Sequence, residues 1–226
     1  LTTGVATDLG ALSFIDAEGV EIVNGTIYGI GGTTNEFWNL TTPPGSLIGA
    51  TGTRNGVDAG LGYNPATGTL YNLNGSSGSS SLYTVNMVTG ATTLVGSSQF
   101  FGDNLAIDGS GAAYAIDGIF ADSLYSVDLS TGAAALVGAL GLGNISAQFG
   151  SDFDSAGILW ALSSSGQIYQ VNPLTGVATF QAQVRLDSIT GPTLDGFEGL
   201  AIDTGAAAIP EPATYLGMCG ALTALA

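Results

Sequence analysis

Short runs of β-branched and aromatic residues recur along most of the chain, and each run is bounded by Gly, Asn, Asp or Ser. Runs of this kind predict β-strands that are separated by tight turns. Before residue 205 the apolar residues do not keep the i, i+3, i+4, i+7 spacing of an amphipathic helix over a long window. We therefore expect an all-β structure over residues 1–204.

The predicted strands repeat with a period of about 44 residues. The clearest unit, Leu82-Tyr83-Thr84-Val85-Asn86 with Thr89-Gly90 after it, returns around Tyr125 and Tyr169, and more weakly around Trp38. A second ladder of aromatic residues is formed by Tyr28, Tyr71, Tyr114 and Trp160. A third ladder of runs ends in Asp or Asn: Phe14-Ile15-Asp16, Gly62-Tyr63-Asn64, Ala106-Ile107-Asp108, Asp152-Phe153-Asp154 and Ala201-Ile202-Asp203. Four strands per period of roughly 40–50 residues predict the blade of a β-propeller.

Four periods are complete, at roughly 11–52, 57–99, 103–142 and 149–184. Residues 3–10 match a fourth strand only, and residues 198–203 match a first strand only. We expect four complete four-stranded blades plus single strands of a further blade at each end. Two explanations stay open: a defective fifth blade closes a small ring, or the propeller domain 1–204 is incomplete at its N-terminus and further sequence precedes Leu1.

After the predicted first strands, an Asp or Asn is followed within a few residues by Gly, as in Asp108 to Gly111 and Asp154 to Gly157. Asx side chains bond nearby backbone N–H groups, and Gly supplies a positive φ, so the pattern favours turns. The alternative is a repeated calcium-binding motif.

Charge excludes several classes of partner. The chain has two basic residues, Arg54 and Arg185, no Lys and no His, and a net charge of -16. Binding to nucleic acid or to anionic lipid heads depends on Lys and Arg, so neither is expected. The single cysteine, Cys219, excludes an internal disulfide.

The repeat stops after Asp203. Residues 205–209 read as a small-residue linker, and Pro210-Glu211-Pro212 follow. Residues 213–226 carry no charge, which favours a short C-terminal apolar helix. About 20 residues are needed to span a bilayer, so the run is too short to do so.

The C-terminal segment 210–226 resembles the PEP-CTERM sorting signal of Gram-negative bacteria, truncated before its basic tail. The resemblance implies that an exosortase-type enzyme recognises Pro210, Glu211 and Pro212, and that the apolar run is a transient inner-membrane anchor. It also implies export to the cell surface or to an extracellular, exopolysaccharide or biofilm matrix. The alternative is a short helix after a Pro-rich turn. The propeller repeats are similar to uncharacterised bacterial repeats of the LYxVDxxTGxxTLVG type.

Candidate chemistry is limited to carboxylates, because the chain has no His, no Lys and no Gly-x-Ser-x-Gly or phosphate-binding loop. Asp103 and Glu198 each precede the end of a predicted first strand by five residues, and Asp58 and Asp195 lie near equivalent positions. Asp152 lies within its predicted strand and could face the channel. Together these five residues could form an acidic ring at one mouth of the channel, able to attract a metal ion. The alternative, which we favour, is that they cap or bond backbone at the entrance.

We therefore expect a non-enzymatic, exported binding or structural module, without a cofactor. The alternative is a calcium-dependent propeller hydrolase, lactonase-like or phytase-like, that uses Asp58, Asp103 and Glu198.

Overall fold

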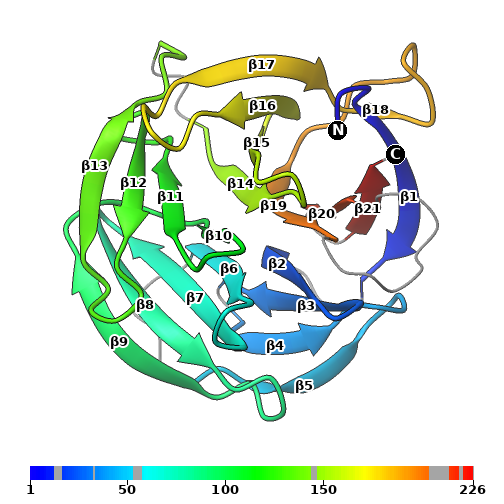
Figure 1. Cartoon of the computed structure of the whole chain (residues 1–226). Helices are drawn as coiled ribbons and strands as arrows, with labels where there is room; N and C mark the ends of the chain where they lie inside the picture. Colours follow the sequence, from blue (N-terminus) through cyan, green and yellow to red (C-terminus); the bar gives the residue numbers. More distant parts are fainter. Residues whose placement is uncertain are drawn as a thin grey trace.

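The computed structural model describes residues 1–12, 17–32, 34–52, 58–143 and 147–203, together with the backbone of two strands at 214–218 and 221–225. The strands form five sheets, which stand as blades around a central axis (Figure 1). The predicted all-β propeller is thus confirmed. The described ranges contain no helix, and therefore none long and apolar enough to cross a membrane.

Four blades are each built from four consecutive antiparallel strands, as the sequence predicts. From the inner to the outer strand they are β2 (Ala17–Val23), β3 (Thr26–Gly31), β4 (Glu36–Asn39) and β5 (Ser46–Ala50); β6 (Asp58–Asn64), β7 (Thr69–Ser76), β8 (Ser79–Val85) and β9 (Thr92–Ser98); β10 (Ala106–Ile107), β11 (Ala113–Asp117), β12 (Ser123–Val127) and β13 (Ala134–Ala139); β14 (Phe149–Phe153), β15 (Leu159–Ser163), β16 (Gln167–Val171) and β17 (Ala178–Gln183). The two aromatic ladders lie on the second and third strands of these blades.

The fifth blade draws strands from both ends of the chain (Figure 1). Its inner strand is β19 (Phe197–Ile202) and its outer strand is β1 (Val5–Ala11), in the first-strand and fourth-strand positions that the sequence predicts. Between them lie β20 (Thr214–Met218) and β21 (Ala221–Leu225). A short strand, β18 (Arg185–Leu186), pairs in parallel with β1 on its other side.

The C-terminal segment differs from the expectation of a short helix over 213–226, because the structure has the strands β20 and β21 in most of it. The physical reason is the blade itself: β1 and β19 alone would leave two strand edges without ladder partners, and two strands between them supply these. The linker 205–209 and the motif Pro210, Glu211 and Pro212 lie outside the described residues.

The first blade starts later than predicted. Its inner strand is β2 at Ala17–Val23, while residues 13–16, which contain the predicted Phe14-Ile15-Asp16 run, lie outside the described residues. The connection from β2 to β3 is the two-residue turn Asn24-Gly25, with φ of 51° and 76°. A two-residue turn is too short to contain the Asp-x-x-Gly spacing seen in other blades. Asp16 and Gly19 have that spacing, so the sequence pattern placed the first turn there, ahead of its true position at Asn24-Gly25.

Glycine explains the repeated Thr-Gly and Leu-Val-Gly motifs. A Cβ added at Gly96 on the outer strand β9 would collide with the carbonyl oxygen of Thr131 in the next blade. Gly132 follows with φ of 72°, and its added Cβ would stand 2.7 Å from the carbonyl carbon of Gly96. The same contact recurs between Gly49 and Thr89 and between Gly138 and Thr175. The motif therefore encodes the seam between blades as well as a turn.

The turn interpretation of the repeated Asp residues is confirmed. Asp108 Oδ1 accepts hydrogen bonds from the backbone N–H groups of Ser110 and Ala112, at 2.8 and 2.9 Å. Asp154 Oδ1 accepts from Ala156 and Ile158, both at 2.9 Å. These carboxylate oxygens hold turns together.

Candidate functional site at the two ends of the channel

The inner strands approach one another closely around the axis because glycine faces the neighbouring blade. A Cβ added at Gly19 would stand 2.6 Å from the carbonyl oxygen of Ala59, and one added at Gly60 would collide with the backbone of Asn104. The same holds for Gly150 against Leu200. The channel therefore narrows to a cavity of about 10 Å³, close to the smallest volume that holds one water molecule.

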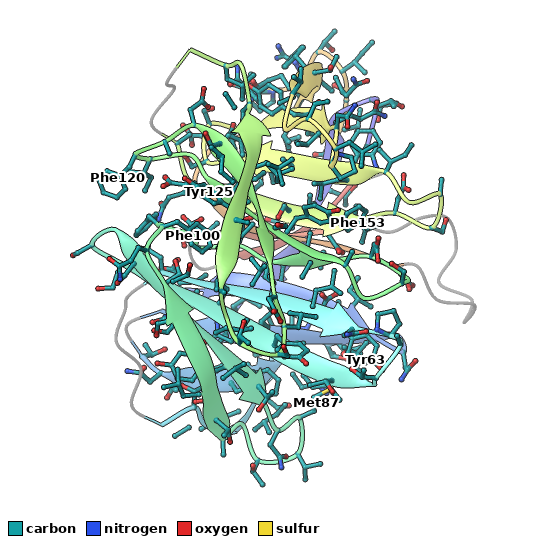
Figure 2. The ribbon with its side chains drawn as sticks, turned by 60° about the vertical axis from the view of Figure 1, so that its left-hand side comes forward. Tyr63, Met87, Phe100, Phe120, Tyr125 and Phe153 are labelled. Atoms are coloured by element: carbon teal, nitrogen blue, oxygen red, sulfur yellow. The ribbon has the colours of Figure 1, made fainter. Side chains whose placement is uncertain are left out.

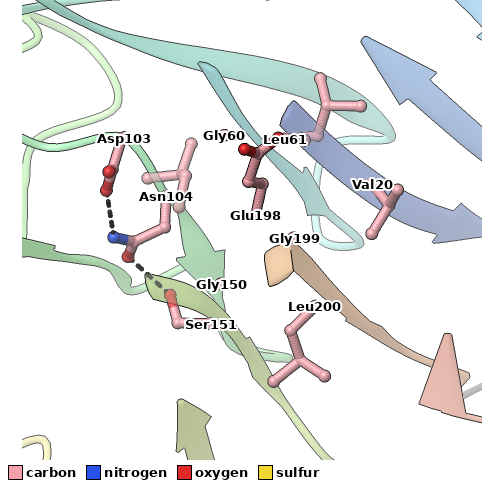
Figure 3. Close-up of a pocket in the computed structure, with 12 residues that line it drawn as sticks. Val20, Gly60, Leu61, Asp103, Asn104, Gly150, Ser151, Glu198, Gly199 and Leu200 are labelled. Atoms are coloured by element: carbon pink, nitrogen blue, oxygen red, sulfur yellow. Dashed lines mark hydrogen bonds between the residues drawn. The ribbon is translucent and has the colours of Figure 1, made fainter. Parts of the chain in front are cut away.

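Asn104 replaces glycine at this level in the third blade, where β10 has only two residues. Its side chain continues the sheet: Nδ2 donates to the carbonyl oxygen of Ile116 at 2.9 Å, and Oδ1 accepts from the Ile116 N–H at 3.0 Å. Ser151 Oγ of the next blade donates to Asn104 Oδ1 at 2.7 Å, and Asn104 Nδ2 also donates to Asp103 at 2.9 Å (Figure 3). One buried amide thus joins two blades.

Replacing Asn104 with Ala is expected to lower the free energy of unfolding by about 2–3 kcal/mol, because the buried N–H and carbonyl of Ile116 lose their partner. Chemical denaturation followed by tryptophan fluorescence measures the change. Gln181→Ala, which removes an amide from the outer strand β17, is the control and should change stability by less than about 0.5 kcal/mol. Equal effects of the two substitutions would contradict the role given to Asn104.

Asp58, Asp103 and Glu198 lie towards the narrow end of the channel, where the charge of Asp58 acts on Asp103. Asp103 and Glu198 line the same narrow cavity (Figure 3). Gln148 Nε2 from the fourth blade donates to Asp58 Oδ1 at 2.8 Å. Asp195 is exposed and does not line the cavity. The structure therefore places Asp103 and Glu198 in one cavity with Asp58 near Asp103, and it places Asp195 outside that cavity; a metal or ligand at these residues stays a prediction.

The electrostatics at this end are those of a buried acid. Burial raises the pKa of Asp103 to about 7, the hydrogen bond from Asn104 opposes this, and the nearby charge of Asp58 adds to it. Among the residues that the structure describes, no group of three or more His, Cys, Asp and Glu side chains is placed to hold a metal ion.

The opposite end of the channel opens into a cavity of about 640 Å³. It is lined by the ends of the inner strands and by the turns that follow them, with Glu21, Tyr63, Asp152, Phe153 and Asp154 among the side chains. Tyr63 and Phe153 lie towards this end of the propeller, and Phe100 and Phe120 lie towards the other (Figure 2). Of these side chains, the sequence identified only Asp152 as an acid that could face the channel, and it lies at the end opposite to Asp103 and Glu198.

Two carboxylates in the wide cavity tie neighbouring blades together. Glu21 accepts hydrogen bonds from the N–H of Ile22 at 2.7 Å and from the N–H of Tyr63 in the next blade at 2.8 Å. Asp152 accepts from Phe153 at 2.8 Å and from Ile202 in the fifth blade at 2.7 Å. Inner strands are sheet edges, so each carboxylate satisfies an N–H group that has no ladder partner.

Both carboxyl groups are held in an environment that disfavours their charge. Burial raises the pKa of Asp152 to about 7, although two backbone hydrogen bonds act in the opposite direction. Burial also raises the pKa of Glu21, and the charge of Asp152 raises it further. A carboxyl group such as Asp152, whose pKa lies near neutral pH, exchanges protons readily there, which general acid–base chemistry requires.

A signal for this pair was present in the sequence. Aligned on their β-ladder partners, Glu21 and Asp152 stand opposite Tyr28 and Trp160. The other blades have small residues at this position: Gly62, Ala106 and Ala201. Two acidic residues at a position where the other three blades have small residues would have indicated a site. The sequence alignment took Phe14-Ile15-Asp16 as the first strand of the first blade, so Glu21 was not compared with this position.

No protein-family model matches the chain, and no curated protein matches it. Solved structures do. Glutaminyl cyclase from Myxococcus xanthus matches with a TM-score of 0.63 and 15% identity over 97% of this chain and 94% of that chain. A protein of unknown function from Bacteroides thetaiotaomicron matches at 0.60 and 10%, over 96% and 70%. A GH43 glycoside hydrolase matches at 0.63 and 11%, over 92% and 49%.

The shared feature is the β-propeller. At these identities the likeness shows the fold alone, because propellers carry many unrelated activities. What the propeller does must be argued from its own surface and cavities.

Proposed function

We propose that this chain is an exported β-propeller that acts as a non-enzymatic binding module at the cell surface or in the extracellular matrix. The observation that carries the binding role is the wide cavity of about 640 Å³. Its walls combine carboxylate oxygens of Asp154 and Asp203 with apolar surface from Tyr63 and Ile107. Acceptors for hydroxyl groups beside aromatic and aliphatic surface suit a neutral, hydroxyl-rich ligand such as exopolysaccharide.

Export and sorting are proposed from the sequence. Pro210, Glu211 and Pro212 before an uncharged run are the features that an exosortase-type enzyme would recognise, with a transient inner-membrane anchor. Expression of wild type and of a variant in which Pro210, Glu211 and Pro212 are all replaced by Ala, followed by fractionation of the cells and medium, tests this and keeps the residues of β20 and β21. Loss of surface material in the substituted chain supports sorting, and unchanged distribution contradicts it.

Tyr63→Ala is expected to weaken binding to neutral exopolysaccharide at least tenfold, because Tyr63 supplies aromatic surface to the wide cavity. Titration of the full chain with a panel of neutral bacterial exopolysaccharides, followed by isothermal calorimetry, measures the loss. Phe120→Ala is the matched control, since Phe120 is an exposed aromatic residue towards the opposite end (Figure 2). Thermal melting of both variants separates lost binding from lost folding.

If Tyr63→Ala and Phe120→Ala both bind the polysaccharide as tightly as wild type does, the binding site lies outside the wide cavity. The same result for Tyr63→Phe and wild type would show that the ring, and not its hydroxyl, makes the contact.

The second candidate is a propeller hydrolase, lactonase-like or phytase-like and dependent on calcium. At the narrow end Asp58, Asp103 and Glu198 would serve such an enzyme. The observation that favours hydrolysis more strongly is the pair of Glu21 and Asp152 in one cavity, since paired carboxyl groups hydrolyse glycosides. Turnover of lactones, phytate and aryl glycosides, with calcium or with a chelator, tests it. Activity lost in Glu21→Gln would support the wide end, activity lost in Asp103→Asn the narrow end, and no turnover would remove the candidate.

A further inference from the structure

The fifth blade contains a slot that a separate piece of chain fills. Its outer strand β1 and inner strand β19 do not pair with each other; the hairpin β20–β21 lies between them (Figure 1). The backbone register is defined on both sides, with Thr7 opposite Ala224 and Ile202 opposite Thr214. Without the hairpin, two facing strand edges would be left without ladder partners.

The slot is framed firmly by the neighbouring blades. A Cβ added at Gly4, in the turn before β1, would collide with the carbonyl oxygen of Gln183 at the end of β17. On the inner side, Ile202 donates its N–H to Asp152 of the fourth blade, and a Cβ added at Gly199 would stand 3.0 Å from the carbonyl oxygen of Glu18. β1 and β19 are thus held by contacts that do not involve the hairpin.

The connection to the hairpin is unusually long. In the other four blades the first and second strands are joined by residues 24–25, 65–68, 108–112 and 154–158, which is two, four, five and five residues. In the fifth blade the same connection is residues 203–213, which is eleven. Because Ile202 and Thr214 are already paired, two to five residues suffice for a local hairpin.

Eleven residues reach up to roughly 36 Å when extended, which is enough to carry a hairpin to an adjacent molecule. Lengthening a connection costs little in loop entropy. The hairpin also carries no charge in a chain of net charge -16, so its transfer adds no repulsion at the slot. The same ladder hydrogen bonds form whichever copy supplies the hairpin, which is the condition for strand exchange.

We propose that the β20–β21 hairpin exchanges between copies, so that a second copy of this chain completes the fifth blade. The inference goes beyond the proposed function and depends neither on export nor on sugar binding. It concerns the folded chain whose residues 214–225 lie in the fifth blade and are not engaged as a membrane anchor. It predicts reciprocal dimers, or longer chains of propellers, that increase with protein concentration.

Two single-cysteine chains test the exchange, both with Cys219→Ser. One carries Thr7→Cys on β1 and the other carries Ala224→Cys on β21, at positions that face each other in the ladder. Paired residues of antiparallel strands lie within disulfide range. When the full chains are mixed, incubated and oxidised, a mixed disulfide dimer forms only if the hairpin of one copy lies beside β1 of the other.

Two controls make the outcome decisive. Replacing Ala224→Cys with Val88→Cys, an exposed turn residue of another blade, measures disulfides formed by random collision. Deleting residues 205–209 leaves a connection of six residues, close to the other blades, and is expected to reduce exchange to the collision level. Thr7→Cys and Ala224→Cys in one chain should still form an intrachain disulfide after the deletion.

A mixed dimer at least several-fold above the collision control is the expected result. No excess at any concentration, together with efficient intrachain disulfide formation, would show that the hairpin stays in its own slot. Failure of both the intrachain and the mixed disulfide would show that the hairpin does not occupy the slot. Either result overturns the proposal, while the exopolysaccharide titration is unaffected by it.

Discussion

Replacing Gly96 with Ala is expected to lower the free energy of unfolding by about 3 kcal/mol, although the change adds one methyl group on an outer strand. The added Cβ would collide with the carbonyl oxygen of Thr131, which is backbone in the next blade. Thr131 belongs to a turn whose Gly132 packs directly against the backbone of Gly96. Relieving the collision therefore requires the two blades to move apart.

The measurement is thermal and chemical denaturation of the variant against wild type. For a chain of this size about 1 kcal/mol corresponds to 2–4 °C in Tm, so a decrease of about 6–12 °C is expected. Gly109→Ala is the matched control, because an added Cβ there meets nothing within 4 Å and the backbone φ is ordinary. If Gly96→Ala has the same Tm as Gly109→Ala, the contact between neighbouring blades accommodates the added methyl group at little cost in stability.

The seam explains why the fold was predictable from the sequence. Tyr83, Tyr125 and Tyr169 recur because each third strand packs in the same surroundings. A Gly recurs within the outer strands β5, β9 and β13 because each of these strands faces the same turn of the next blade. A repeated physical contact leaves a repeated residue, and four copies make the period visible. The strands of the fifth blade from the two chain ends were visible for the same reason.

The middle of the fifth blade was not predictable by this route. Residues 214–225 lack the Thr-Gly pair of the repeat, and their uncharged composition favours an apolar helix as much as a strand. Tyr215 does stand opposite Ala201 as Tyr114 stands opposite Ala106, but the long connection before it displaces it from the regular spacing of the aromatic ladder. Their strand pairing depends on the two edges that β1 and β19 present, which are distant in sequence. Local pattern carries no information about that requirement.

The candidate sites divide in the same way. Asp58, Asp103 and Glu198 were located by a fixed offset from turns that repeat. Glu21 depends on the register of the first blade, and the two-residue turn at Asn24 and Gly25 hides that register. Asp152 lies in the fourth blade, where the repeat is regular, and the sequence identified it as an acid that could face the channel. The blade that breaks the turn pattern is therefore the blade that contributes the unpredicted acid.

Asp152→Asn is expected to flatten the pH dependence of stability and to make the protein more stable than wild type at pH 8. Burial raises the pKa of Asp152 from 3.8 to about 7, so the folded state holds a proton that the unfolded state releases. This contribution is fully present below pH 3.8 and is lost as pH rises through about 7. It amounts to at most about 4 kcal/mol, because one pKa unit corresponds to about 1.4 kcal/mol.

Wild type should therefore lose stability between about pH 4 and pH 8, and Glu21, whose pKa burial also raises, adds to the same trend. The asparagine removes the cost of burying a charge at high pH. Its side chain keeps one oxygen, which can accept from the N–H of Ile202 or of Phe153. Its NH₂ group faces the other N–H, and the lost hydrogen bond reduces the gain in the free energy of unfolding by about 1 kcal/mol.

The experiment is urea denaturation at a series of pH values from 4 to 8, for wild type, Asp152→Asn and Asp195→Asn. Asp195 is exposed, so its substitution removes the same charge from a chain of net charge -16 without relieving burial. Any gain from weaker overall repulsion is shared by the two variants. The difference between them therefore isolates the blade-bridging carboxyl group. A wild type that becomes more stable as pH rises, or an Asp152→Asn profile parallel to that of Asp195→Asn, would mean that Asp152 is charged in the folded protein at no cost, and that its two hydrogen bonds outweigh its burial.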